Sequence, residues 1–171
     1  NPPQSLINYP NLFYSQALFL QIMEVLFYIA VLLGTFLLME GITWCTHKYV
    51  MHGFLWNLHR DHHHKDHKSW FERNDAFFIF YAVVSMTCFY FWSYEGFWAG
   101  LPIGLGIMAY GATYFIVHDI FIHQRFKYFR NANNWYAKGL RRAHKIHHKH
   151  LGKGDGECYG MLFVPFKYFK R

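Results

Sequence analysis

Basic residues are absent from two long stretches of this chain of 171 residues. No lysine or arginine occurs in residues 1–47 or 74–124, so all 17 basic residues fall in two blocks, residues 48–73 and 125–171. The chain is also 53% hydrophobic and 22% aromatic, which is high for a soluble protein of this size. This composition predicts a membrane protein of one domain. The net charge of +7 gives no separate case for nucleic-acid binding.

Cysteine is also scarce, and the three cysteines are not arranged in pairs. Cys45, Cys88 and Cys158 lie far apart in the sequence and form no CxxC motif. This excludes a disulfide framework and predicts reduced thiols that lie in or face a cytosol. Residues 1–22 lack the basic start and the small-residue cleavage pattern of a signal peptide, so we expect a non-cytoplasmic or interfacial segment there.

Three long runs without charged residues have the composition of membrane-spanning helices. They cover residues 25–39, 76–93 and 97–117, and the first reaches spanning length when it is extended to about 23–45. A transmembrane helix needs about 20 mostly apolar residues. The second and third runs are joined by YEG alone, which predicts a tight hairpin. The sequence therefore predicts an all-α integral membrane protein with three to four transmembrane helices.

The distribution of the basic residues predicts the orientation of these helices. If each run crosses the membrane once, both basic blocks lie on the same side. The positive-inside rule makes that side cytoplasmic. We therefore expect a multi-pass protein whose C-terminus lies in the cytoplasm.

Histidine is concentrated in four clusters with two repeated spacings. HKYVMH and HDIFIH each place two histidines five residues apart, and HRDHH and HKIHH each place three at positions i, i+3 and i+4. A solvated loop or an adventitious metal-binding tract explains one such cluster, but not the same order of spacings in both halves of the chain. We predict that ten of the 13 histidines bind metal, namely His47, His52, His59, His62, His63, His118, His123, His144, His147 and His148.

The spacings also constrain the geometry of the site. On an α-helix, positions i, i+3 and i+4 lie on one face, so HxxHH aims three imidazoles in the same general direction. Positions i and i+5 lie well apart around the helix axis. An HxxxxH pair therefore binds one ion only where the helix is locally distorted, unless each histidine reaches a different ion. His64, His67 and His150 fall outside these patterns and are expected at the surface.

The number and type of ligands favour a site for two metal ions. A closed site for one zinc ion needs four ligands, and ten ligands fit two ions. Imidazole binds zinc, copper, iron and nickel, so ligand type alone does not select the metal. A nearly all-neutral two-metal site beside a lipid-facing cavity favours iron that activates O2 toward an unactivated C–H bond. The non-enzymatic alternative is a histidine-rich zinc transport or storage protein, although transporters usually place such ligands near the bilayer midplane.

Several polar residues adjoin the histidine clusters. Asp119 is the favoured partner of a metal-bound imidazole, because such imidazoles usually donate their second N–H to a carboxylate or carbonyl; a helix-end charge is the alternative. Glu40 lies just after the first run, within its extension to residue 45, and seven residues before His47; it is expected to hold a ligand histidine or to pair with a neighbouring helix. Asn74 or Asp75 is expected to cap the helix that begins there.

The motifs resemble those of the membrane fatty acid hydroxylase superfamily, and within it the bacterial and plant beta-carotene hydroxylases. The resemblance is carried by MEGITWCTHKYVMHGFLWNLHRDHH, FERNDAFF, MAYGATYFIVHDIFIHQRF and RRAHKIHHKHLGKGDGECYGMLFVP. These segments lie between Met39 and Pro165, and the order of the four histidine motifs is specific to this group. The implied arrangement is a membrane hydroxylase domain over residues 23–171, with a cytoplasmic histidine-rich cap that holds two metals.

The resemblance implies an O2-dependent di-iron monooxygenase of the bacterial inner membrane that hydroxylates the beta-ionone rings of beta-carotene at carbon 3. The products would be beta-cryptoxanthin and then zeaxanthin, with electrons from reduced ferredoxin. The ten motif histidines would be the iron ligands, with zinc as a substitute ion. Within the superfamily, hydroxylases of sterols or fatty acyl lipids and carotenoid ketolases remain the alternatives. Gly100, Gly104, Gly106 and Gly111 either permit close helix packing or leave a slot for a rigid polyene.

Overall fold

The computed structural model describes residues 10–64 and 69–170, and every regular element in them is a helix. Three helical stretches are long and apolar enough to cross a membrane: Tyr14–Phe54, Asp75–Glu95 and Gly100–Ile122. They contain the first two predicted runs and all but residues 97–99 of the third, so the predicted class of an all-α membrane protein is confirmed. Large apolar side chains on these helices, such as those of Leu37 and Met86, are exposed. A surface of this kind suits lipid, because water would drive such side chains into a core.

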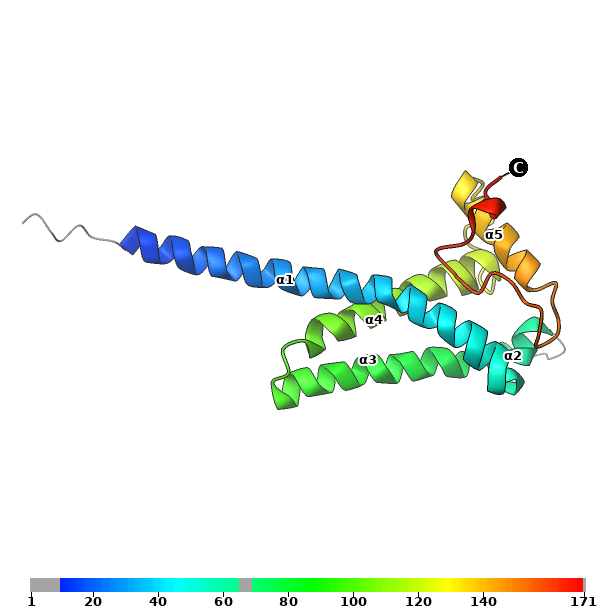
Figure 1. Cartoon of the computed structure of the whole chain (residues 1–171), viewed down its shortest axis with the longest axis horizontal. Coiled ribbons are helices and arrows are strands. Elements are labelled where there is room, and N and C mark those ends of the chain that lie inside the picture. Colours follow the sequence, from blue (N-terminus) through cyan, green and yellow to red (C-terminus); the bar gives the residue numbers. More distant parts are fainter. Residues whose placement is uncertain (1–9, 65–68, 171) are drawn as a thin grey trace, which may run out of the picture.

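The first spanning helix is longer than the membrane requires. α1 (Pro10–Cys45) has 36 residues and projects well beyond the other helices (Figure 1). At 1.5 Å per residue it is about 54 Å long, whereas the hydrocarbon core is about 30 Å thick. α1 therefore extends beyond the core at one end or both. It runs without a break through residues 22 and 23, where we placed the start of the hydroxylase domain.

The second and third spans form the predicted hairpin. α3 (Asp75–Glu95) ends at Gly96, whose φ of +67° is a left-handed conformation that residues with a side chain rarely adopt. The N–H of Phe97 donates to the carbonyl of Phe91 at 3.1 Å and closes the turn into α4 (Gly100–Tyr114). α4 packs against both α1 and α3. The resulting core is formed by the buried residues Met39, Ile107, Tyr110 and Met161.

The remaining elements form a cap at one end of the three spans (Figure 1). They are the π-helix η1 (Thr46–Phe54), α2 (Trp56–His63), the π-helix η2 (Phe115–Ile122), α5 (Trp135–His147) and the 3-10 helix η3 (Phe166–Tyr168). η1 continues α1 and η2 continues α4, so two of the spans lead directly into the cap.

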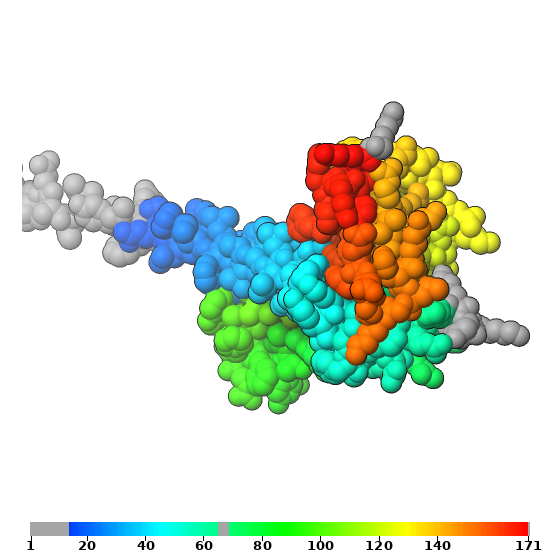
Figure 2. Space-filling model, turned by 45° about the vertical axis from the view of Figure 1, so that its right-hand side comes forward, coloured from blue at the N-terminus to red at the C-terminus, as the bar shows by residue number. Residues whose placement is uncertain are grey.

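A segment without regular structure runs between α5 and η3, and we call its residues 153–163 the C-terminal strap. Figure 2 shows this part of the chain, in orange to red, lying over one face of the cap. Its carbonyl and N–H groups face inward at several points, as described below. The strap therefore belongs to the packing of the cap, although it forms no helix.

Candidate metal centre

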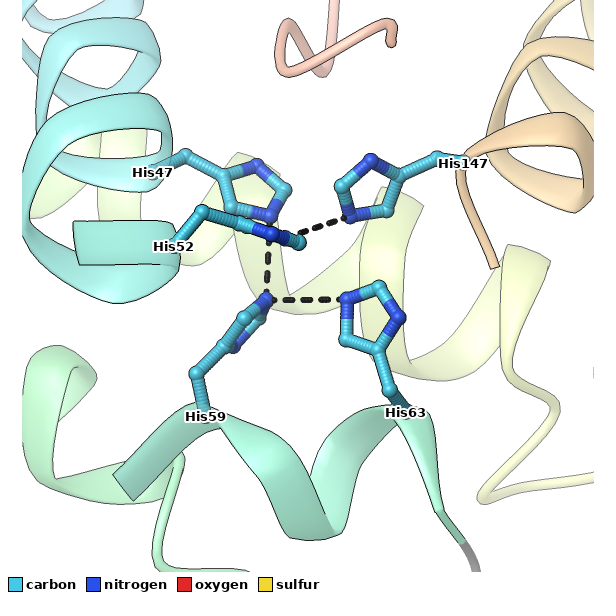
Figure 3. A group of neighbouring side chains, drawn as sticks. All are labelled: His47, His52, His59, His63 and His147. Atoms are coloured by element: carbon cyan, nitrogen blue, oxygen red, sulfur yellow. Dashed lines mark hydrogen bonds between the residues drawn. The ribbon is translucent and has the colours of Figure 1, made fainter. Parts of the chain in front are cut away.

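Nine of the ten predicted histidines form two groups in the cap. The first histidine group comprises His47, His52, His59, His63 and His147, and the second comprises His62, His123, His144 and His148. Within each group, one ring nitrogen per residue lies within 4.8 Å of the others. Figure 3 shows the rings of the first group converging from η1, α2 and the end of α5.

The tenth histidine, His118, lies beside the second group. Its ring centroid is 4.5 Å from that of His123 and 4.9 Å from those of His62 and His144. Its buried Nδ1 has no hydrogen-bond partner in the described part of the chain. His118 is therefore close enough to contribute to the second group after a small movement of its ring.

Each half of the chain supplies one histidine to the group formed mainly by the other half. In HRDHH of α2, the outer two histidines join the first group and the middle one, His62, joins the second. In HKIHH at the end of α5, the outer two join the second group and the middle one, His147, joins the first. Helix geometry permits this, because position i+4 lies about 40° from i and position i+3 about 60° from i in the opposite sense. The common direction that we predicted therefore holds for the outer two histidines of each motif.

Both HxxxxH pairs lie on π-helices. His47 and His52 are in η1, and the second pair begins with His118 in η2 and ends at its C-cap, His123. In a π-helix the N–H of residue i+5 donates to the carbonyl of residue i, as His123 does to His118 at 2.8 Å. Residues five apart consequently stack one turn above each other. The local distortion that a shared site requires is present in both halves of the chain.

Backbone carbonyls fix the tautomer of three histidines in the first group. Nδ1 of His47, His52 and His147 donates to the carbonyls of Tyr159, Lys153 and Glu157, at 3.0, 3.3 and 3.0 Å respectively. A carbonyl oxygen only accepts, so the proton of each neutral imidazole is on Nδ1 and Nε2 carries a lone pair. All three carbonyls belong to the C-terminal strap.

These lone pairs face other ring nitrogens at short distances. Nε2 of His52 is 3.4 Å from Nε2 of His147, and neither nitrogen has a proton to share. Nε2 of His59 is 3.1 Å from Nε2 of both His47 and His63 (Figure 3). Two nitrogens that bind one ion at about 2.1 Å each lie at most about 4.2 Å apart. Opposed lone pairs repel each other unless a cation lies between them, so this set of donors fits a bound metal ion.

The second group is held from outside by a carboxylate. Nδ1 of His62 donates to Oε2 of Glu72 at 2.7 Å, which leaves a lone pair on Nε2. This Nε2 is buried and has no hydrogen-bond partner among the described residues. A buried lone pair without a donor also fits a metal ligand.

Arg125 organises the carboxylates beside the second group. Its guanidinium lies 3.0 Å from Glu72, 2.9 Å from Asp75 and 3.1 Å from Asp119. Glu72 is the residue that accepts from His62, so the charge of Arg125 stabilises the acceptor of a candidate ligand. We did not identify Arg125 from the sequence as part of the site.

Two of the predicted polar partners differ from expectation. Oδ2 of Asp119 is 3.7 Å from Nδ1 of His118, which is beyond hydrogen-bond distance, and the other carboxylate oxygen pairs with Arg125. Asn74 occupies the N-cap position of α3 without a capping hydrogen bond, so capping by Asn74 is wrong. Its Oδ1 instead accepts from Nδ1 of His59 at 2.7 Å. Of the two expected capping residues, Asp75 accepts from a backbone N–H, that of Glu72, at 3.0 Å.

Glu40 anchors the strap and has no direct contact with a ligand histidine. Its Oε1 accepts from the backbone N–H groups of Met161, Leu162 and Phe163, at 2.9, 2.8 and 2.9 Å respectively. Its Oε2 accepts from the hydroxyl of Tyr110 on α4 at 2.7 Å. Glu40 therefore pairs with a neighbouring helix, as one of our two expectations proposed, and also fixes the segment whose carbonyls orient the first group.

Burial lowers the pKa of four cap histidines, His59, His62, His144 and His147, and so favours their neutral form. It lowers the pKa of His147 to about 4 and that of His59 to about 2, against an ordinary value of 6.5. Burial, followed by repulsion from neighbouring imidazoles such as that of His123, holds the pKa of His62 and of His144 well below the ordinary value. Neutral imidazole is the form that binds metal, so these ligands need no deprotonation at pH 7.

The three histidines outside the repeats do not join either group where they are described. Nε2 of His64 donates to the carbonyl of Leu151 at 2.8 Å. His150 is partly exposed and follows the end of α5. His67 lies outside the described residues.

Comparison with known proteins gives one consistent result. The family model described as fatty acid hydroxylase matches residues 31–169. The chain is 39% identical to a beta-carotene hydroxylase of Pantoea ananas over 127 residues. These residues are 74% of this chain and 71% of that protein. It is 32% identical to a beta-carotene hydroxylase of Paracoccus sp. over 139 residues. These residues are 79% of this chain and 83% of that protein.

A plant relative covers a similar part of the chain. The chloroplastic beta-carotene 3-hydroxylase 2 of Arabidopsis thaliana is 36% identical over 142 residues, which are 77% of this chain and 46% of the plant protein. No solved structure matches the chain. The family match spans four fifths of the chain and contains all ten motif histidines, and the chain belongs to the fatty acid hydroxylase family.

Proposed function

We propose that this protein is a beta-carotene 3-hydroxylase that uses O2 and two iron ions held by the two histidine groups. The observation that carries the proposal is the pair of all-histidine groups, with buried and half-buried members, in the cap at the end of three membrane-spanning helices. The bacterial and plant relatives named as beta-carotene hydroxylases support the substrate. Imidazole ligands suit iron but also zinc, copper and nickel, so the choice of iron rests on the reaction.

The two histidine groups have defined roles in the proposed reaction. The first and second histidine groups would hold one ion each, with His118 as a further candidate ligand of the second. Bound iron would supply the redox chemistry that activates O2. Overall, one C–H bond of the ring becomes C–OH, the second oxygen atom leaves as water, and two electrons and two protons are consumed.

The surrounding residues orient the ligands. The strap carbonyls hold the Nδ1–H groups of three first-group histidines, and Glu72 holds that of His62. Such partners fix ring orientation and raise ligand basicity, and their loss typically costs 10–100-fold in metal affinity or activity. Asn74 performs the same task for His59. The chain therefore provides a preorganised set of lone pairs from residues far apart in sequence.

Pigment analysis tests the function directly. Cells that make beta-carotene and express the chain should accumulate beta-cryptoxanthin and zeaxanthin, whereas cells with the His147→Ala variant should retain beta-carotene. A keto product would instead assign the chain to the ketolases. Unchanged beta-carotene with well-expressed, membrane-inserted protein would contradict the proposed activity.

We also propose that the cap faces the cytoplasm of a bacterial cell and receives electrons there from reduced ferredoxin. All lysines and arginines fall in residues 48–73 and 125–171, whose described parts contribute to the cap, and the positive-inside rule places such segments in the cytoplasm. Three lysines on and just after α5, Lys138, Lys145 and Lys149, are exposed. Ferredoxins as a class are acidic, and complementary charge chiefly speeds encounter.

Two arginines of α5 are unsuitable probes of docking because they brace the cap. Arg141 donates to the carbonyls of Ala132 and Phe129, and Arg142 donates to that of Tyr168. Reversing their charge would disturb the fold. The exposed lysines have no such contacts among the described residues.

Reversing Lys138, Lys145 and Lys149 together to glutamate should slow ferredoxin-driven turnover by roughly 10-fold at low salt. The difference from the wild type should shrink as salt rises, because surface charges are screened within about 10 Å at 0.1 M. Lys127→Glu, on the loop before α5, serves as the matched control. Turnover and salt dependence equal to those of the wild type, with full metal content, would place donor docking elsewhere.

A further inference from the structure

An apolar cavity of about 520 Å³ lies among α1, α3 and α4. α4 packs against both other helices, and residues from all three line the space. Along α3 the lining extends from Asp75 to Phe89, which is about 21 Å at 1.5 Å per residue. The cavity is therefore elongated along the spans, a shape that suits a rod-like ligand.

One end of this cavity adjoins the metal centre. Asn74, which accepts from His59, lines it, and so does Asp119, which pairs with Arg125. Tyr114 also lines it, and its ring stacks on that of His118 with centroids 4.6 Å apart. A ligand that fills the cavity would place one end next to the second histidine group.

The flank of the cavity opens toward the lipid-facing surface. Among its lining residues, Ile79 is 60% exposed, Met86 is 68% exposed and Met108 is 52% exposed. All three side chains are apolar, so the opening presents no charge to the bilayer. An apolar ligand dissolved in the membrane can enter sideways without crossing water.

The glycines of α4 separate into two kinds. A Cβ on Gly104 would lie 2.7 Å from the ring of Phe89, and one on Gly106 would lie 2.7 Å from Cβ of Thr35. Gly100 is similarly crowded by the carbonyl of Cys88. These three permit close helix packing, the first of the two expectations from the sequence.

Gly111 differs from them because it lines the cavity and has space beside it. A Cβ there would meet Phe78 at 3.8 Å, an ordinary contact, and no other described atom within 4 Å. Helix packing therefore does not require glycine at this position. Gly111 lies seven residues before His118, about 10 Å along the helix, so a ligand that reaches the metal centre passes it.

We propose that the cavity among α1, α3 and α4 takes one ring end of the carotenoid sideways from the bilayer, with Gly111 as the specificity-determining residue that leaves room for the ring. This inference rests on the proposed function. In this inference, glycine at position 111 leaves room for the ligand, whereas the other three glycines of α4 permit close helix packing. A Cβ at Gly111 makes only an ordinary contact with Phe78, and a larger side chain there would take up cavity space.

The test compares Gly111→Leu and Gly111→Ala with the matched control Gly34→Leu. Gly34 is an exposed glycine of α1 that does not line the cavity, and a Cβ there would meet no described atom within 4 Å. Each variant is made in cells that produce beta-carotene. The measurements are hydroxylated products in the cells, and carotenoid and metal per chain in the purified protein.

Gly111→Leu should lower both hydroxylation and co-purified carotenoid by at least 10-fold and leave metal content unchanged. Gly111→Ala should have a smaller effect on both, and Gly34→Leu should match the wild type. Replacing glycine within a helix does not by itself destabilise it, since glycine has low helix propensity. Both measurements therefore report on the cavity and not on folding.

Normal carotenoid binding and hydroxylation by Gly111→Leu would overturn the inference while leaving the proposed function intact. An equal loss in Gly34→Leu, or loss of metal from Gly111→Leu, would also overturn it. If the wild type neither binds nor hydroxylates carotenoid, the proposed function fails and the inference fails with it. The behaviour of the wild type thus distinguishes the two failures.

Discussion

His147→Ala is expected to abolish hydroxylation, with a loss of at least 100-fold. His147 is fully buried at 0% exposure, and its Nε2 faces Nε2 of His52 at 3.4 Å. It is the histidine that α5 contributes to the first group, so its loss removes a candidate ligand and one of the two histidine links between the halves of the chain. Loss of a group that merely orients a ligand costs 10–100-fold, and loss of the ligand itself should cost more.

His62→Ala should have the same effect through the other group, because His62 is the histidine that α2 contributes to it. Metal analysis of the purified variants should show preferential loss of the first-group ion from His147→Ala and of the second-group ion from His62→Ala. His150→Ala is the control and should retain most activity and both ions. Equal losses in all three variants would mean that the boundary of the ligand set is drawn wrongly.

Glu40→Ala is expected to release the C-terminal strap and weaken the first metal site from a distance. The substitution leaves three strap N–H groups, one buried and two partly buried, and the buried hydroxyl of Tyr110 without their acceptor. Each unsatisfied buried group costs about 1–3 kcal/mol, so the strap loses several kcal/mol of attachment. The carbonyls that orient His47, His52 and His147 move with it. Affinity at the first group should fall by roughly 10–100-fold, while the second group retains its ion.

Glu40→Gln should show a smaller defect, since the amide keeps one oxygen that accepts from the strap. Glu24→Ala is the matched control, an exposed glutamate on the same helix, and should behave as the wild type. Metal titration of each variant measures the two affinities separately. Equal weakening of both sites in Glu40→Ala would contradict a role that acts through the strap alone.

The sequence was sufficient to predict the spans, the hairpin and the convergence of the motif histidines, nine of which lie in the two groups. Uncharged runs of spanning length and the turn at YEG are local features, and helices form from local features. The i, i+5 spacing of the HxxxxH pairs indicated either a distorted helix or histidines that reach different ions, and η1 and η2 are π-helices. The start of the first span was not predicted, because Ser15, Gln16 and Gln21 interrupt the apolar residues before residue 23, whereas the spanning stretch begins at Tyr14.

The division of ligands between the groups could not be predicted from spacing. His62 and His63 are adjacent, and which group each one joins depends on how α2 packs against η1, η2 and α5. The strap partners of Glu40 lie more than 120 residues away, in a segment with no periodic pattern. Arg125 had a weak signal, since Glu72, Asp75 and Asp119 flank the clusters and buried carboxylates require a cation. Asn74 was assigned to capping because the local rule does not include a histidine 15 residues earlier.

The central claim is that two metal ions occupy the two histidine groups. Anomalous diffraction from crystals of the iron-loaded protein, collected on both sides of the iron edge, tests it most directly. The account predicts two iron peaks per chain, one among His47, His52, His59, His63 and His147, and the other among His62, His123, His144 and His148. A single peak, or peaks coordinated outside these groups, would contradict it.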